Sequence, residues 1–203
     1  MKKILALLAS SFLLLSGQAL AQSHAAHEHG VATLDLAIVA DGFEVGLDGP
    51  LANFISFEHE PSTDDQKAEV AAMVDKLARA GELFRAPAEA GCRARTISLE
   101  SGNIPAEYFG AYAAAEGHGH EDGEGHGPEA GEAHEGDEGE AGHEHGDLEA
   151  SYVFECSDPG RLTGLEIGLF GQFPALEEVE ARVVGDQGQS ASELTPGQTS
   201  LRW

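Results

Sequence analysis

The histidines of this chain are concentrated in a few short segments. The tetrapeptide HEHG occurs at 27–30 and again at 143–146, and the segment 116–147 holds six histidines, twelve acids and ten glycines. This segment contains no Lys, Arg, Leu, Ile, Val or aromatic residue. Imidazole nitrogen and carboxylate oxygen together bind divalent transition metals, and glycine lets a chain wrap an ion at little steric cost. The composition therefore predicts metal binding by a segment that is disordered when empty.

Nine histidines are the predicted metal ligands. His-x-His pairs can place two imidazoles on one ion, and FEHEP at 57–61 adds a histidine just before a predicted helix. If the strands that follow the two HEHG copies lie side by side, their leading imidazoles converge and the FEHEP histidine can join them. The alternatives are capping or terminal histidines and an inert acidic loop. The candidate ligands are His27, His29, His59, His118, His120, His126, His134, His143 and His145.

Zinc is the metal that this set of ligands favours. The scarcity of sulfur argues against Cu(I), and a calcium or magnesium site would not need imidazole. Nitrogen with oxygen suits Zn(II), and Cu(II), Ni(II) and Co(II) are competitors because affinity follows the Irving–Williams order. Cleavage after Ala21 would also leave Gln22-Ser23-His24, an amino-terminal motif whose square-planar nitrogen set suits Cu(II) or Ni(II).

The first residues and the charge predict where the protein works. Residues 1–21 have a basic start, an apolar run and an ALA cleavage site, which is the pattern of a secretory signal peptide. We expect one mature zinc-binding domain over 22–203, exported to a bacterial periplasm. No later apolar run approaches the roughly 20 residues of a membrane-spanning helix. The formal net charge of -25 makes nucleic acid a poor partner and cations good ones.

Hydrophobic periodicity predicts the elements that must hold these histidines. Apolar stretches on either side of Asp41-Gly42 predict a hairpin with strands near 31–39 and 43–48. The 62–84 segment predicts one long amphipathic helix that starts at a capping box and ends before Pro87. Segments 177–184 and 199–203 add strands. The capping residues are Thr63 and Gln66, and the apolar face comprises Val70, Met73, Val74, Leu77, Gly81 and Phe84.

Two further strands, 92–100 and 149–156, carry the two cysteines at opposite ends. Antiparallel pairing places Cys92 opposite Cys156 and Ser98 opposite Ala150, so one disulfide would staple this hairpin. In this hairpin, residues 101–148 form the connecting loop, which is expected to be mobile and is rich in His, Asp, Glu and Gly. The alternative to the disulfide is two free thiols.

An internal echo completes the predicted fold. The pattern G-[FL]-E-[VI]-G-L-x-G occurs at 42–49 and 164–171, each time after an HEHG and one strand. Unless the match is chance, it predicts two related β-units in one sheet. The expected class is α+β: a mainly antiparallel sheet of six or seven strands, one long amphipathic helix, and the disordered His-rich loop.

The segments HEHGVATLDLAI, FEHEP, YVFEC and LFGQFPALEEVEARV, with the His-rich loop between them, resemble the ZrgA-type family of bacterial periplasmic zinc-binding proteins. The resemblance spans most of the mature chain. It implies zinc binding in the periplasm and zinc supply or export through an ABC-type transporter. The family pattern points to His27, His29, His59 and His145 as ligands.

We therefore expect a non-enzymatic protein that buffers, captures or delivers Zn(II). A Cu(II)- or Ni(II)-handling protein would use the same residues. Two more interpretations are a zinc hydrolase and a structural module with an inert loop. The sequence contains no nucleophile–base motif, phosphate-binding loop or HExxH to support an enzyme.

Overall fold

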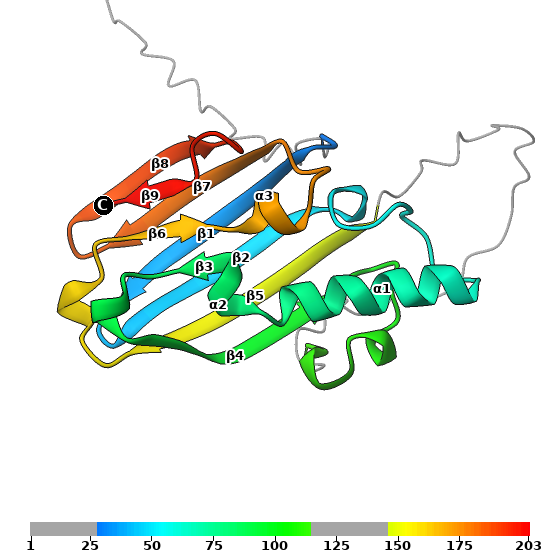
Figure 1. Cartoon of the computed structure of the whole chain (residues 1–203), viewed down its shortest axis with the longest axis horizontal. Coiled ribbons are helices and arrows are strands. Elements are labelled where there is room, and N and C mark those ends of the chain that lie inside the picture. Colours follow the sequence, from blue (N-terminus) through cyan, green and yellow to red (C-terminus); the bar gives the residue numbers. More distant parts are fainter. Residues whose placement is uncertain (1–27, 115–145) are drawn as a thin grey trace, which may run out of the picture.

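The computed structural model describes residues 28–114 and 146–203, which form two β-sheets (Figure 1). The larger sheet has six strands in the order β4-β5-β2-β1-β7-β8, and the smaller has three in the order β3-β6-β9. Every strand pairing is antiparallel except that of β1 with β7. The larger sheet comprises β1 (Val31–Val39), β2 (Gly42–Pro50), β4 (Cys92–Glu100), β5 (Asp147–Cys156), β7 (Glu178–Gly185) and β8 (Gly188–Leu194). The smaller comprises β3 (Phe84–Arg85), β6 (Gly164–Ile167) and β9 (Ser200–Arg202).

Helices and short turns connect these strands and cover the inner face of the larger sheet together with the smaller sheet (Figure 1). None of the helices in the described part of the chain is long and apolar enough to cross a membrane. The α-helices are α1 (Asp64–Leu77), α2 (Ala80–Leu83) and α3 (Leu169–Gln172). The 3-10 turns are η1 (Leu51–Asn53), η2 (Ala88–Ala90), η3 (Ala106–Tyr108), η4 (Gly110–Tyr112) and η5 (Pro159–Arg161).

One hydrophobic core lies between the two sheets. Along β5, alternate residues point inward and are buried, whereas Glu149, Ser151 and Val153 point outward. The ring of Phe84 in β3 packs edge-on against the inward ring of Tyr152, with ring centroids 4.9 Å apart. Polar and charged residues therefore predominate on the outer face of the larger sheet, where Val153 and Val184 are the exposed large hydrophobic residues of the described chain.

The predicted helix over 62–84 is interrupted. Helix α1 begins at the predicted capping box of Thr63 and Gln66, and its inward residues Val70, Met73, Val74 and Leu77 are buried. It ends at Leu77, because Arg79 leaves the helical conformation with a ψ of 51°. Gly81 is exposed in the separate short helix α2, and Phe84 pairs with Ile167 in the smaller sheet. Phe84 is therefore buried in the core as part of a strand, and the chain does not continue as one helix to this residue.

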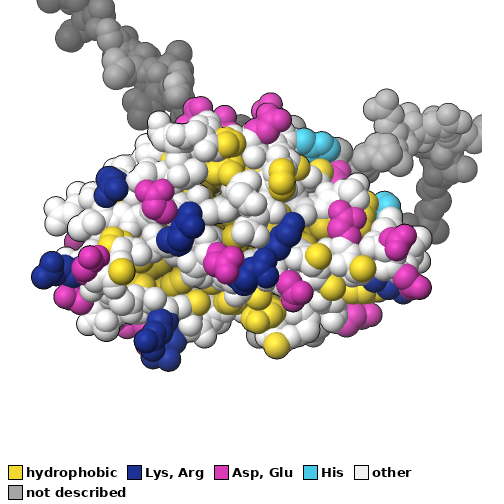
Figure 2. All heavy atoms as spheres, viewed as in Figure 1, with side chains coloured by type: hydrophobic (Ala, Val, Ile, Leu, Met, Phe, Trp, Pro, Cys, Tyr) yellow, Lys and Arg dark blue, Asp and Glu magenta, His cyan; other side chains and the backbone are white. Residues whose placement is uncertain are grey.

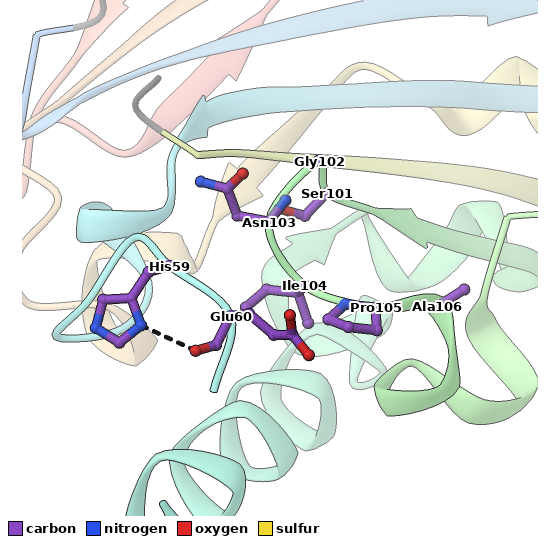
Figure 3. Close-up of a pocket in the computed structure, with 8 residues that line it drawn as sticks. All are labelled: His59, Glu60, Ser101, Gly102, Asn103, Ile104, Pro105 and Ala106. Atoms are coloured by element: carbon purple, nitrogen blue, oxygen red, sulfur yellow. Dashed lines mark hydrogen bonds between the residues drawn. The ribbon is translucent and has the colours of Figure 1, made fainter. Parts of the chain in front are cut away.

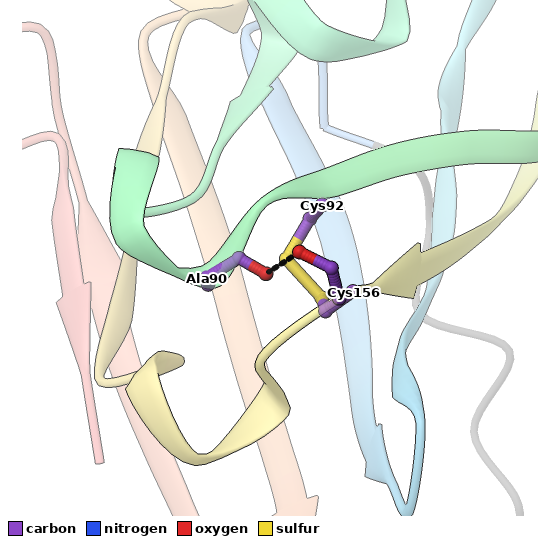
Figure 4. Close-up of a disulfide and its surroundings, with 4 residues drawn as sticks. Ala90, Cys92 and Cys156 are labelled. Atoms are coloured by element: carbon purple, nitrogen blue, oxygen red, sulfur yellow. Dashed lines mark hydrogen bonds between the residues drawn. A yellow bond between two sulfur atoms is a disulfide. The ribbon is translucent and has the colours of Figure 1, made fainter.

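The cysteine hairpin forms, with one correction to its register. Cys92 faces Cys156, and the two form a disulfide that joins the start of β4 to the end of β5 (Figure 4). Ala150, however, faces Leu99, and Ser98 faces Ser151. A β-bulge between Ala94 and Thr96 inserts one extra residue into β4, which shifts all later pairs by one.

The predicted loop over 101–148 is shorter than expected. Residues up to 114 fold into the turns η3 and η4, with Ile104 and Phe109 buried in the core, and β5 already begins at Asp147. Residues 101–114 contain apolar and aromatic side chains that can be buried, whereas the sequence of 116–147 has no Leu, Ile, Val or aromatic residue. The tract predicted to be disordered, 116–147, lies outside the described residues as far as 145, as does the signal peptide, and Asp147 at its end belongs to β5.

The two copies of the glycine pattern do not form two β-units of one sheet. The first copy is β2 in the larger sheet, whereas the second starts as β6 in the smaller sheet and continues into α3. After Ile167 the backbone of Gly168 donates to the carbonyl of Leu83, and the chain turns into the helix. The strand β8 was also missed, because GQSASEL has little apolar alternation and forms by pairing with β7.

Replacing Cys92 and Cys156 by alanine should lower the free energy of unfolding by about 4 kcal/mol, because the disulfide closes a loop with a sequence separation of 64 residues. Urea unfolding of the variant and of the oxidised wild type measures the difference. A reducing agent should destabilise the wild type and leave the variant unchanged. Equal unfolding midpoints for the oxidised wild type and the variant would contradict the assigned cross-link.

Candidate metal site

Both HEHG copies lead into the same edge of the larger sheet. Strands β1 and β5 are each antiparallel to β2, so both begin where β2 ends. The predicted side-by-side arrangement of these two strands is wrong, because β2 lies between them. Two strand spacings separate their starts by roughly 10 Å. Beyond the end of β2, the turn η1 crosses this edge (Figure 1).

Turn η1 holds the last residue of each HEHG copy. The Asn53 side chain accepts a hydrogen bond from the Gly30 amide at 2.6 Å and donates one to the Val31 carbonyl at 2.7 Å. The Leu51 amide donates to the Gly146 carbonyl at 2.8 Å. The two motifs are thus anchored on one three-residue turn.

The glycine that ends each motif is required by the fold. Gly30 has a φ of +90°, a backbone conformation that residues with a Cβ rarely adopt. A Cβ on Gly146 would lie 2.6 Å from Nδ2 of Asn103 and 2.8 Å from Cδ1 of Leu51. The last position of each HEHG is therefore constrained by the backbone, through the positive φ of Gly30 and the close contacts of Gly146.

His29 lies beside Glu58 at this edge. Nε2 of His29 is 3.2 Å from Oε1 of Glu58, whose side chain is 20% exposed. The backbone carbonyl of Glu58 accepts a hydrogen bond from Nδ2 of Asn103 at 2.5 Å. In the sequence, Glu58 stands out only as a neighbour of His59. The signal that could have identified it is its place directly after Phe57, whose buried ring fixes the backbone next to it.

His59 lies in a different local environment. Its Nδ1 is 2.9 Å from the Glu60 carbonyl, and its Nε2 is 3.5 Å from Nε2 of the capping residue Gln66. With Glu60 and the 101–106 segment it lines an open, polar pocket of about 440 Å³. Its ring points away from Asn103 (Figure 3). The histidine thus sits at the start of α1, on the rim of this pocket.

Within 28–114 and 146–203, no three His, Cys, Asp or Glu side chains are close enough together to hold a metal ion. The described residues bring His29 together with Glu58, and they do not gather His59 into a group of three. The remaining predicted ligands, with His24, lie outside the described residues. They are His27, His118, His120, His126, His134, His143 and His145.

The outer face of the sheet is strongly acidic next to this edge. One row of facing residues crosses all six strands, and five of its six members are carboxylates: Glu100, Glu149, Asp48, Thr33, Glu180 and Glu193. Partial burial, a hydrogen bond with Glu100 and the neighbouring charges raise the pKa of Glu149. Burial and the carboxylates of Glu193, Glu180 and Glu28 likewise raise the pKa of Glu178. Such a surface favours the approach of cations.

The histidines of the described chain share this acidic end of the molecule. Figure 2 shows the two histidine side chains at one end, with acidic side chains around them. The Lys and Arg side chains of that face lie mainly away from them. The arrangement combines imidazole nitrogen, carboxylate oxygen and a negative field, which suits a divalent metal ion.

A family model of ZrgA family zinc uptake proteins matches residues 26–203. The chain belongs to the ZrgA family. The match includes both HEHG copies and every described residue, and it confirms the resemblance seen in the sequence. Family membership associates the chain with zinc and with metal transport. A search of curated proteins found no match.

Replacing Glu149 by glutamine should raise the free energy of unfolding at pH 7 by about 0.2–1 kcal/mol, because like charges on facing strand positions destabilise a sheet. A raised pKa in the folded state means that stability falls as pH rises from about 4.5 through that pKa. In Glu149→Gln, the free energy of unfolding should fall less between pH 4 and pH 7 than in the wild type. Urea unfolding of both proteins at the two pH values measures this difference.

The matched control is Glu44→Gln, because Glu44 is on the same outer face but faces Val153 and Ala37. An equal gain from both substitutions would assign the effect to net charge instead of the carboxylate row.

Proposed function

We propose that this protein is a non-enzymatic, periplasmic zinc-binding protein that captures Zn(II) and delivers it to a transport system. The observation that carries the proposal is the contact of η1 with the glycines that end both HEHG copies, at an edge where His29 lies beside Glu58. Membership of a zinc uptake family supports zinc as the cargo. Receipt of the ion by an ABC-type transporter component fits the same role.

The spacing of His29 and Glu58 suits two ligands of one zinc ion. Zinc binds imidazole nitrogen at about 2.0–2.1 Å and carboxylate oxygen at about 2.0–2.2 Å in tetrahedral geometry. Two such ligands lie roughly 3.4 Å apart by the same geometry. The observed separation of Nε2 and Oε1 is 3.2 Å. A zinc ion can therefore enter between these groups with small side-chain movements.

The remaining ligands of this site are assigned to neighbours in sequence. His27 precedes His29 by two residues, and His145 directly precedes Gly146, whose carbonyl is bonded to η1. Each residue spans at most about 3.6 Å of extended chain, so both histidines start within a short reach of the edge. His59 belongs to the same end and can take part in transfer of the ion.

The His-rich segment 116–142 is assigned a different task. Its histidines and acids offer many overlapping, weak binding modes, and the acidic row on the sheet raises the local concentration of cations. The segment captures ions and passes them to the ordered site. Cu(II) or Ni(II) is the alternative cargo, because both metals bind the same ligand types tightly.

Calorimetric titration of the mature protein should give one tight zinc site plus several weaker ones. Deletion of 116–142 should remove the weaker ones and keep the tight site. His29→Ala should weaken the tight site at least about tenfold, because it removes a ligand. His59→Ala is the comparison for the tight site, since it removes a histidine that could take part in transfer but that lies on the rim of the neighbouring pocket instead of beside Glu58.

Binding weaker than roughly millimolar, both in the mature protein and in the deletion variant, would contradict the proposal. Preferential retention of Cu(II) or Ni(II) in a competition with zinc would shift the cargo to those metals. Hydrolytic activity of the zinc-loaded protein, abolished by His29→Ala, would contradict the non-enzymatic role.

A further inference from the structure

Asn53 is an unusual residue of the described core. Its side chain is 1% exposed, and apart from the Tyr152 phenol no other polar or charged side chain is buried to that extent in 28–114 and 146–203. A buried amide costs free energy unless its groups are hydrogen-bonded. Here both ends are used, by the Gly30 amide and the Val31 carbonyl. The absence of a side chain at Gly49 makes space for the Asn53 amide, since a Cβ on Gly49 would lie 3.4 Å from Nδ2 of Asn53.

The hydrogen bonds of Asn53 act on the residues directly after His29. They fix the backbone at the point where the chain leaves the HEHG motif and enters β1. An apolar side chain could fill this buried position without the free-energy cost of desolvating an amide. The role of the Asn53 amide is therefore to fix the backbone at Gly30 and Val31 through its hydrogen bonds.

Asn103 makes the corresponding contact on the opposite ligand. Its Nδ2 donates to the carbonyl of Glu58, and the same side chain packs against Gly146. One asparagine thus holds the backbone next to His29, and the other holds the backbone of Glu58. The separation of His29 and Glu58 depends on both.

We propose that Asn53 and Asn103 are positioning residues that set the spacing of the His29–Glu58 pair for zinc. This inference rests on the proposed zinc-binding function. Neither asparagine is assigned contact with the ion, and each acts through the backbone of a ligand or of its neighbour. Partners that orient metal ligands in this way typically change metal affinity by about 10–100-fold when they are replaced.

The test compares Asn53→Ala and Asn103→Ala with Val183→Ala in the full mature chain. Val183 is a buried β7 residue that pairs with Leu36, several residues from the edge where β7 and β1 begin. Zinc affinity of the tight site is measured by calorimetry at a temperature where all variants are folded by circular dichroism. We expect both asparagine variants to bind at least about tenfold more weakly than Val183→Ala, even where their Tm values match.

The outcomes separate the two proposals. A wild-type protein without a tight zinc site overturns the proposed function itself. A wild type that binds tightly, with asparagine variants that bind as tightly as Val183→Ala, overturns the positioning role and leaves the function standing. If Asn53→Ala does not fold, half-buried Asn103 decides the question alone: tight binding by Asn103→Ala overturns the inference.

Discussion

The hydrogen bonds between turn η1 and the two HEHG glycines are the constraint on which the candidate metal-binding end depends. Strand β2 lies between β1 and β5 and is antiparallel to both, so the topology brings both motifs to one edge. The turn that follows β2 then bonds Gly30 through Asn53 and Gly146 through Leu51. Motifs more than a hundred residues apart in sequence thereby share one fixed point.

Strand pairing and the disulfide stabilise the larger sheet, although carboxylates beside this edge repel one another. A row of carboxylates crosses the outer face beside it. Burial, together with the charges of neighbouring carboxylates that include members of this row, raises the pKa values of Glu149 and Glu178. Strand β5 is held along its whole length by β2, and the disulfide ties its far end to β4. The same negative field that costs stability favours a bound cation. Stability and cation attraction are therefore opposed at this end of the molecule.

Local patterns in the sequence were sufficient for several elements. The Asp-Gly turn predicted β1 to the residue, the cysteine spacing predicted the disulfide, and Thr63 with Gln66 predicted the start of α1. Features decided by distant contacts could not be read in this way. The bulge in β4, the break after Leu77 and the second sheet all depend on partners far away in sequence. The prediction from the repeated glycine pattern at 164–171 was wrong for the same reason, because its strand β6 pairs in the smaller sheet.

The candidate site divides along the same line. Histidine is recognisable by type, so the sequence predicts His29 and His59 as candidate ligands, but the roles proposed for Glu58 and Asn53 depend on the approach of separate segments. The most direct test is diffraction at the zinc absorption edge from crystals of the protein loaded with one equivalent of zinc. We expect an anomalous peak about 2.0–2.1 Å from Nε2 of His29. A peak on the outer carboxylate row, with none at His29, would contradict it.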